Sequence, residues 1–351
     1  MRKPKLFRTY LITLPSHAAQ LDGIGIHGEW QIKTQDDPSF RHWSNLDEQG
    51  GRNTLFTEMS STEIRKQKKR YILCKEVLIE TESEDTATNV ASLIQTGTLL
   101  GYPEISNGPK HFGVDKATKK MEKIMRGKPF CNWFTFQENT IYGCKVAIAA
   151  WAEPSLRYAI EKYRFSLELD SFTPHSASPG SGQVFLNQFP DYSYHVHAAT
   201  ALLVAFSVIE ELGLEIRSSA RKPRFIDSKW NPDVKEDIEK RLQKNGVDLS
   251  EPIFWVYHGR PSKLELDIKP KLGSPAVYVD AKVVRDQKME IVDAIRQASY
   301  IRNYIVAHKY SELVSDLGPY DVHNVQLLAR RLILSALGLY KVSDPNLFFT
   351  S

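Results

Sequence analysis

The chain has 351 residues, of which 42% are hydrophobic and 25% charged, and a formal net charge of +4. These values are typical of a globular protein, and the length predicts two domains. The mild positive charge permits nucleic-acid binding without requiring it. The three cysteines are odd in number and have no CxxC spacing, which argues against a disulfide framework and against a zinc knuckle, and fits a reducing cytoplasm.

Neither a secretory signal nor a spanning segment is expected. Residues 6–14 carry Arg8, Thr9 and Thr13, so no apolar core of a signal peptide follows the basic N-terminus. The most apolar stretch, residues 198–209, is about half as long as a spanning helix. We therefore expect a soluble cytoplasmic protein that makes no contact with a membrane.

Residues 1–151 are predicted to form a mixed α+β domain. β-Branched and aromatic residues predict strands over residues 6–14, 23–33 and 71–80. The stretch 34–62 is polar and loop-like. The basic run 65–70 is either a solvated entry to the third strand or a contact with an RNA backbone, and the first interpretation is favoured.

The second half of this domain combines helical and strand-like patterns. Ser83 is suited to cap a helix that ends near Gly101. A short basic helix is predicted within residues 116–128. Residues 129–136 and 140–148 are rich in aromatic and β-branched side chains. We find neither a phosphate-binding glycine loop nor a catalytic constellation in this half of the chain.

Residues 152–351 are predicted to be mainly helical. Amphipathic or apolar patterns predict helices over residues 154–169, 192–212, 287–309 and 321–337. The second of these is apolar nearly all round and should be central. Residues 217–277 form an insertion. It holds one strongly marked helix, with Asn231 as N-cap, Pro232 at the first position and Gly246 after the last turn, and a hairpin of residues 254–257 and 264–268.

The helix at 287–309 carries an RNxxxxH pattern formed by Arg302, Asn303 and His308. On a helix, Arg302 and His308 lie about 120° apart around the axis and about 9 Å apart along it. They therefore flank one strip of the surface. A second copy of the helix packed on this strip would bring two arginines and two histidines into one cleft.

This pattern resembles the RNA-cleaving motif of the HEPN superfamily, an arginine, usually followed by a polar residue, with a histidine four to six positions later. The resemblance covers residues 153–340 and implies a HEPN-like all-α helical bundle. It implies a metal-independent endoribonuclease without cofactors, working as a homodimer with a composite active site. The expected substrate is tRNA or mRNA. The expected role is that of a toxin or antiviral defence effector, with a regulatory partner protein as an open possibility.

Each residue of the motif suits a step of RNA cleavage. His308 suits proton transfer near neutral pH. Arg302 suits the stabilisation of the negative charge on the phosphorane oxygens. Asn303 is expected to orient the phosphate or the partner's histidine. Two further substrate contacts, Lys309 and Tyr310, are expected along the RNA backbone. Glu210, on the central helix, is expected to orient the Arg302 guanidinium.

Other interpretations stay open. A catalytically silent HEPN bundle would serve dimerisation or RNA binding in a larger complex. The acidic-x-Lys elements at 267–269 and 280–282 would suit a metal-dependent DNA nuclease, although such tripeptides are common by chance.

For three histidines outside the motif, a structural position is favoured over a functional one. His195 and His197 point about 200° apart on a helix, so we expect core or interface positions instead of metal ligands. His258 and Arg260 fall in a predicted turn, and an ordinary surface turn is favoured over a nucleobase or phosphate contact.

Overall fold

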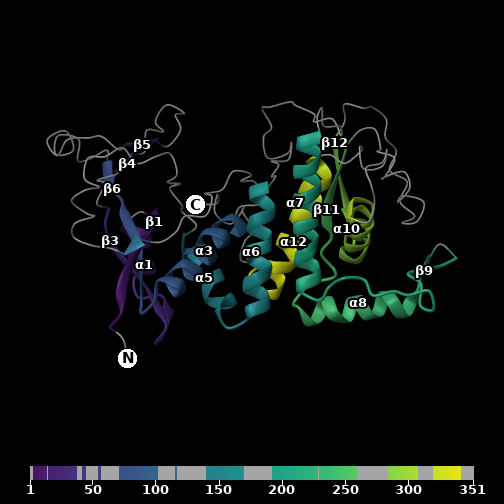
Figure 1. Cartoon of the computed structure of the whole chain (residues 1–351), viewed down its shortest axis with the longest axis horizontal. Coiled ribbons are helices and arrows are strands. Elements are labelled where there is room, and N and C mark those ends of the chain that lie inside the picture. Colours follow the sequence, from purple (N-terminus) through teal and green to yellow (C-terminus); the bar gives the residue numbers. More distant parts are fainter. Residues whose placement is uncertain are drawn as a thin grey trace. The chain divides into compact units, whose positions relative to one another are not determined.

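The computed structural model (Figure 1) describes residues 3–13, 15–37, 42–44, 54–56, 71–101, 115–116, 140–169, 192–227, 229–258, 284–306 and 319–340. Among these residues, one compact unit ends at Ala152 and a second begins at Glu153. Helices and antiparallel strands occur in both units, so the chain belongs to the α+β class. Within the described residues, no helix has the length and apolar character needed to cross a bilayer.

An antiparallel sheet forms the centre of the first unit, with the strand order β2-β3-β7-β1-β8. The predicted strand at residues 6–14 is confirmed as β1, and most of the strand at 71–80 is confirmed as β7. Ile12, Ile32 and Ile79 are fully buried, as the β-branched pattern predicts. The strands are β1 (Lys5–Thr13), β2 (Gly25–Ile26), β3 (Trp30–Asp36), β7 (Lys75–Thr81) and β8 (Asp115–Lys116).

Residues 23–33 form a hairpin and not the single predicted strand. Gly28 has a φ of 82°, a left-handed conformation that favours glycine, and the chain reverses there so that Ile26 pairs with Trp30.

Some elements of the first unit have no counterpart among the predictions. The stretch 34–62, expected to be loop-like, contributes β4 (His42–Ser44) and β5 (Thr54–Phe56). These strands form a second sheet with β6 (Tyr71–Leu73). Helix α1 (Pro15–Leu21) is also absent from the predictions.

Two helices of this unit, α3 (Glu84–Gly101) and α5 (Thr140–Trp151), pack closely against each other. α3 begins as predicted, because the Ser83 hydroxyl accepts the Thr86 N–H at 3.1 Å. Residues 140–148 are helical although their composition is typical of strands. A Cβ on Gly97 would lie 2.7 Å from the Cα of Gly143, so the two backbones touch. This tertiary contact outweighs the local preference.

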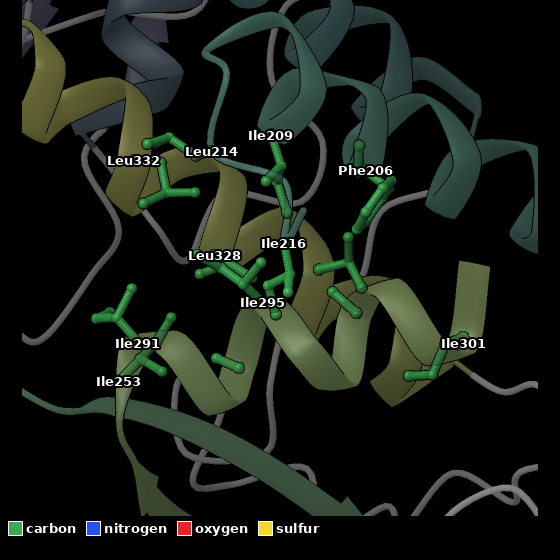
Figure 2. Close-up of a cluster of buried hydrophobic side chains, with 14 of the residues drawn as sticks. Phe206, Ile209, Leu214, Ile216, Ile253, Ile291, Ile295, Ile301, Leu328 and Leu332 are labelled. Atoms are coloured by element: carbon green, nitrogen blue, oxygen red, sulfur yellow. The ribbon is translucent and has the colours of Figure 1, made fainter. Parts of the chain in front are cut away.

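The second unit is built around α7 (Tyr192–Glu211), which contacts α6 (Pro154–Leu169), α10 (Ile291–Val306) and α12 (Pro319–Ala336). The predicted helices at 154–169, 192–212 and 321–337 are confirmed, and α10 and α12 are in contact as expected. Each side chain buried in such a core contributes about 1.5–3 kcal/mol. Figure 2 shows part of this core, with Phe206 and Ile209 from α7, Ile295 and Ile301 from α10, and Leu328 and Leu332 from α12.

The section between α7 and α10 holds α8 (Pro232–Lys244), whose predicted ends are confirmed. Asn231 Oδ1 accepts the Asp233 N–H at 3.2 Å, and Gly246 after the last turn has a φ of 73°. A short hairpin of β9 (Phe225–Ile226) and β10 (Lys229–Trp230) precedes this helix.

The pairing of β11 (Ile253–His258) with β12 (Val284–Met289) corrects one prediction and leaves another untested. The predicted partner of β11, residues 264–268, lies outside the described residues. Gln287 was expected to open the helix that carries Arg302, but it is a strand residue opposite Trp255, and α10 begins at Ile291. The boundary between β12 and α10 is decided by pairing with a strand about 30 residues earlier in the sequence, and no local sequence pattern indicates such pairing.

Candidate functional site

Arg302 lies at the border between the buried and the exposed face of α10. Ile295, Ala298 and Ile301 of the same helix are buried in the core. Arg302 follows Ala298 by four residues and therefore leaves the helix next to that face. Its side chain is 34% exposed. The guanidinium thus reaches water while the aliphatic stem covers apolar surface.

The Arg302 guanidinium contacts two residues of α7 and its own neighbour. Its Nη2 lies 3.2 Å from Oε1 of Glu210, and its Nη1 donates to Oδ1 of Asn303 at 3.3 Å. Its Cζ lies 5.7 Å from the ring centroid of Phe206, within the range of a cation–π contact. Phe206 and Glu210 are four residues apart on α7, so successive turns of one helix face hold the same cation.

These contacts orient the guanidinium more than they stabilise the fold. Glu210 is 42% exposed, and an ion pair in such a position contributes about 0–1 kcal/mol. The Phe206 ring is fixed because it is buried in the core. A fixed ring and a carboxylate together limit the rotamers of Arg302. The exposed N–H groups of the planar guanidinium are able to donate two parallel hydrogen bonds to a phosphate.

The structure brings together three of the predicted site residues: Arg302, Asn303 and Glu210. Asn303 is exposed. The predicted histidine, His308, lies outside the described residues, as do Lys309 and Tyr310. The 120° relation between Arg302 and His308 is therefore still a prediction.

The competing metal sites at 267–269 and 280–282 also lie outside the described residues. In the part of the chain that is described, no group of three His, Cys, Asp or Glu side chains is placed to hold a metal ion. Cys74 and Cys144 are buried, and Cys131 lies in a segment that is not described.

The other predicted histidines are placed in part. His197 is exposed on α7, so the prediction of a core position is wrong for this residue. An interface position stays a prediction. The side chain of His195 is not described. The backbone of His258 pairs with Val284 and ends β11, so this residue extends a strand and does not lie in the predicted turn. Arg260 lies outside the described residues.

Two features near Arg302 are missing from the sequence-based site. The first is the Phe206 ring, which lies on the same face of α7 as Glu210 but whose contact with Arg302 depends on how α7 and α10 are aligned. The second is the segment 217–229, whose Arg224 donates to the Ser299 hydroxyl on α10 at 3.4 Å. The density of basic residues in that segment was visible in the sequence.

Comparisons of the chain with protein-family models, with curated proteins and with solved structures found no match. The chemical interpretation of Arg302 therefore depends on two observations. One is the resemblance of residues 302–308 to the HEPN motif, and the other is the set of contacts that α7 makes with the guanidinium.

Proposed function

We propose that the protein is a metal-independent endoribonuclease of HEPN type in which Arg302 binds the scissile phosphate of RNA. One observation carries this proposal: the guanidinium is partly exposed while Glu210 and Phe206 hold it in one orientation. Arginine is always charged, and its planar fork matches phosphate oxygens. Residues 152–351 are then a HEPN-like bundle with an insertion at about 217–277.

RNA supplies its own nucleophile, so the proposed reaction needs no metal. The 2′-oxygen forms a bond to phosphorus while the bond from phosphorus to the 5′-oxygen breaks. The proton of the 2′-hydroxyl passes to a base, and an acid protonates the 5′-oxygen. The products carry a 2′,3′-cyclic phosphate and a free 5′-hydroxyl. An imidazole such as that of His308 suits these proton transfers, which accelerate a reaction by about 10²–10⁴.

The proposed site is composite. Two copies of the chain, related by a two-fold axis, would each supply one Arg302 and one His308. One histidine then accepts the proton while the other donates one. The two guanidinium groups compensate the negative charge that develops on the phosphorane oxygens. The proposed biological role is that of a toxin or antiviral effector that cuts tRNA or mRNA.

Cleavage of total RNA by the purified full-length protein tests the proposal. We expect cleavage in the presence of EDTA and products with cyclic-phosphate ends. Arg302→Ala should lower the rate about 10²–10³-fold, as the loss of one such donor does elsewhere. Arg164→Ala is the matched control, because Arg164 is also a surface arginine of the second unit and is paired with Glu161 and Glu168.

The outcomes separate the candidate functions. Cleavage by Arg302→Ala at the parent rate would show that Arg302 is not part of the site. RNA binding without cleavage would favour a silent bundle for dimerisation or RNA binding. Cleavage that EDTA abolishes would favour a metal-dependent nuclease that uses Asp267 and Lys269. Growth arrest on expression of the parent, and not of Arg302→Ala, would support the toxin or defence role.

A further inference from the structure

A basic segment, residues 217–229, lies in the second unit and includes β9 and the first residue of β10, next to the start of α8 (Figure 1). All of its residues except Ser228 are described. It contains one acidic residue, Asp227, so its formal charge of +4 equals the net charge of the whole chain. Its five basic residues are Arg217, Arg221, Lys222, Arg224 and Lys229.

Three of these cations form no direct ion pair with a carboxylate among the described residues. Arg221, Lys222 and Lys229 are exposed and form no ion pair within the described residues. Arg217 pairs with Glu215 at 2.9 Å. Elsewhere on the second unit, ion pairs occupy the basic side chains of Lys162, Arg164, Lys235, Lys240 and Arg241. The basic segment therefore carries five basic residues against one carboxylate, and most of its charge is not paired directly.

The conformation of the segment is fixed by its own hydrogen bonds. Ser219 and Lys222 exchange two backbone hydrogen bonds, of 2.9 and 3.1 Å, which close a tight turn around Arg221. The Asn231 side chain donates to the Pro223 carbonyl at 2.9 Å. A cationic surface held in this way loses less conformational entropy on binding than a flexible one.

Phe225 of the segment and Trp230, which directly follows the segment, contact α10. The Trp230 indole donates to Oδ1 of Asp293 at 2.7 Å. The guanidinium of Arg296 lies 5.5 Å from the centroid of the Phe225 ring. Because Asp293 and Arg296 are three residues apart, these two contacts lie on neighbouring turns of the helix.

A third contact joins the segment to the helical turn of α10 that precedes Arg302. Arg224 donates to the Ser299 hydroxyl at 3.4 Å. Arg302 follows Ser299 by three residues, which is about 4.5 Å along the helix axis and about 60° around it. The basic segment therefore contacts the part of α10 that adjoins the candidate phosphate-binding arginine.

We infer that residues 217–229 form the surface that binds the backbone of single-stranded RNA and leads it to Arg302. Arg221, Lys222 and Lys229 contact phosphates. Ile226, which is 50% exposed, provides an apolar contact for unstacked bases. The inference rests on the proposed function for the identity of the polyanion and for the role of Arg302.

Binding of a labelled single-stranded RNA with methylated 2′-oxygens, measured by fluorescence anisotropy at several salt concentrations, tests the inference without cleavage. The variant Arg221→Gln/Lys222→Gln/Lys229→Gln should reduce the slope of log K against log salt by about 2, since each phosphate contact to a single strand contributes about 0.7. At 0.1 M salt its affinity should fall about 10–100-fold.

Two controls separate a local effect from a general one. Lys3→Gln/Lys5→Gln/Lys145→Gln removes three exposed charges from the first unit and should leave the slope unchanged. The charge-preserving variant Arg221→Lys/Lys222→Arg/Lys229→Arg should bind like the parent, because the binding depends on the charges of these side chains.

The inference and the proposed function fail in different ways. Equal slopes for the parent and the glutamine variant overturn the inference, even if the parent cuts RNA. A parent that binds through this surface and never cuts RNA overturns the proposed function and leaves the inference standing.

Discussion

Gly97→Ala tests whether the contact between α3 and α5 determines the local structure of the first unit. In the interior of a helix, alanine is about 1 kcal/mol more favourable than glycine, so α3 by itself should gain stability. In the folded unit, the added Cβ would lie 2.7 Å from the Cα of Gly143, 2.9 Å from the Cβ of Val146 and 3.0 Å from the Gly143 carbonyl oxygen. Two of these obstacles are backbone atoms, so no rotamer change relieves them.

The size of the effect follows from these distances. A Cβ in ordinary contact lies about 3.4 Å or more from its neighbours, so the helices have to separate by about 0.7 Å. Overpacking of this kind costs about 1–3 kcal/mol, and rigid obstacles favour the upper part of that range. After the gain in helix propensity, we expect a net loss of about 1–2 kcal/mol, which corresponds to roughly a 5- to 30-fold change in the opening equilibrium.

Hydrogen exchange of peptides from residues 84–101 and 140–151 measures this loss directly, without assuming that the two units unfold together. The pair Asn89→Gly and Asn89→Ala is the matched control, because Asn89 is exposed on the same helix. There, alanine should slow exchange relative to glycine. If Gly97→Ala also slows exchange in both peptides, the backbone contact does not decide the conformation of α5.

Three further predictions concern other residues. Burial raises the pKa of Cys144 to about 12, so at pH 8 the thiol stays protonated, and peptide mapping after iodoacetamide should find it alkylated only in denatured protein. Glu76→Ala removes the buried carboxylate that pairs with Arg8 at 2.6 Å, and should cost about 3–5 kcal/mol in urea unfolding. Glu76→Gln keeps an acceptor and should cost less. Phe206→Leu removes the ring beside Arg302 and should lower kcat for RNA cleavage, while Ile209→Leu, one turn along the same core face, should leave it unchanged.

Elements whose ends carry local signals could be predicted from the sequence. The Asn231 side chain, the proline after it and Gly246 mark both ends of α8, and each acts through a contact within a few residues. The apolar pattern of α7 predicted a buried helix because its periodicity leaves no polar face. In these cases the physical cause of the structure lies inside the element itself.

Elements that depend on distant partners could not be predicted. The strand β12 exists because it pairs with β11, and α5 packs as a helix because Gly143 meets Gly97. At the candidate site, opposite charge on two helices was enough to suggest that Glu210 orients Arg302. The Phe206 ring requires the relative alignment of α7 and α10, which no local pattern contains.

The division of α10 into separate faces explains how one helix can serve core, surface and site at once. Ile295 and Ile301 hold the helix in the core, while Ser299, one turn after Ile295, accepts the hydrogen bond of the basic segment. Arg302 then leaves the same helix toward Glu210. Because the core contacts fix the helix independently of the two polar ones, the proposed RNA binding by the basic segment and the proposed phosphate binding by Arg302 should be lost separately on substitution. A loss of both through one surface substitution would mean that α10 itself had moved.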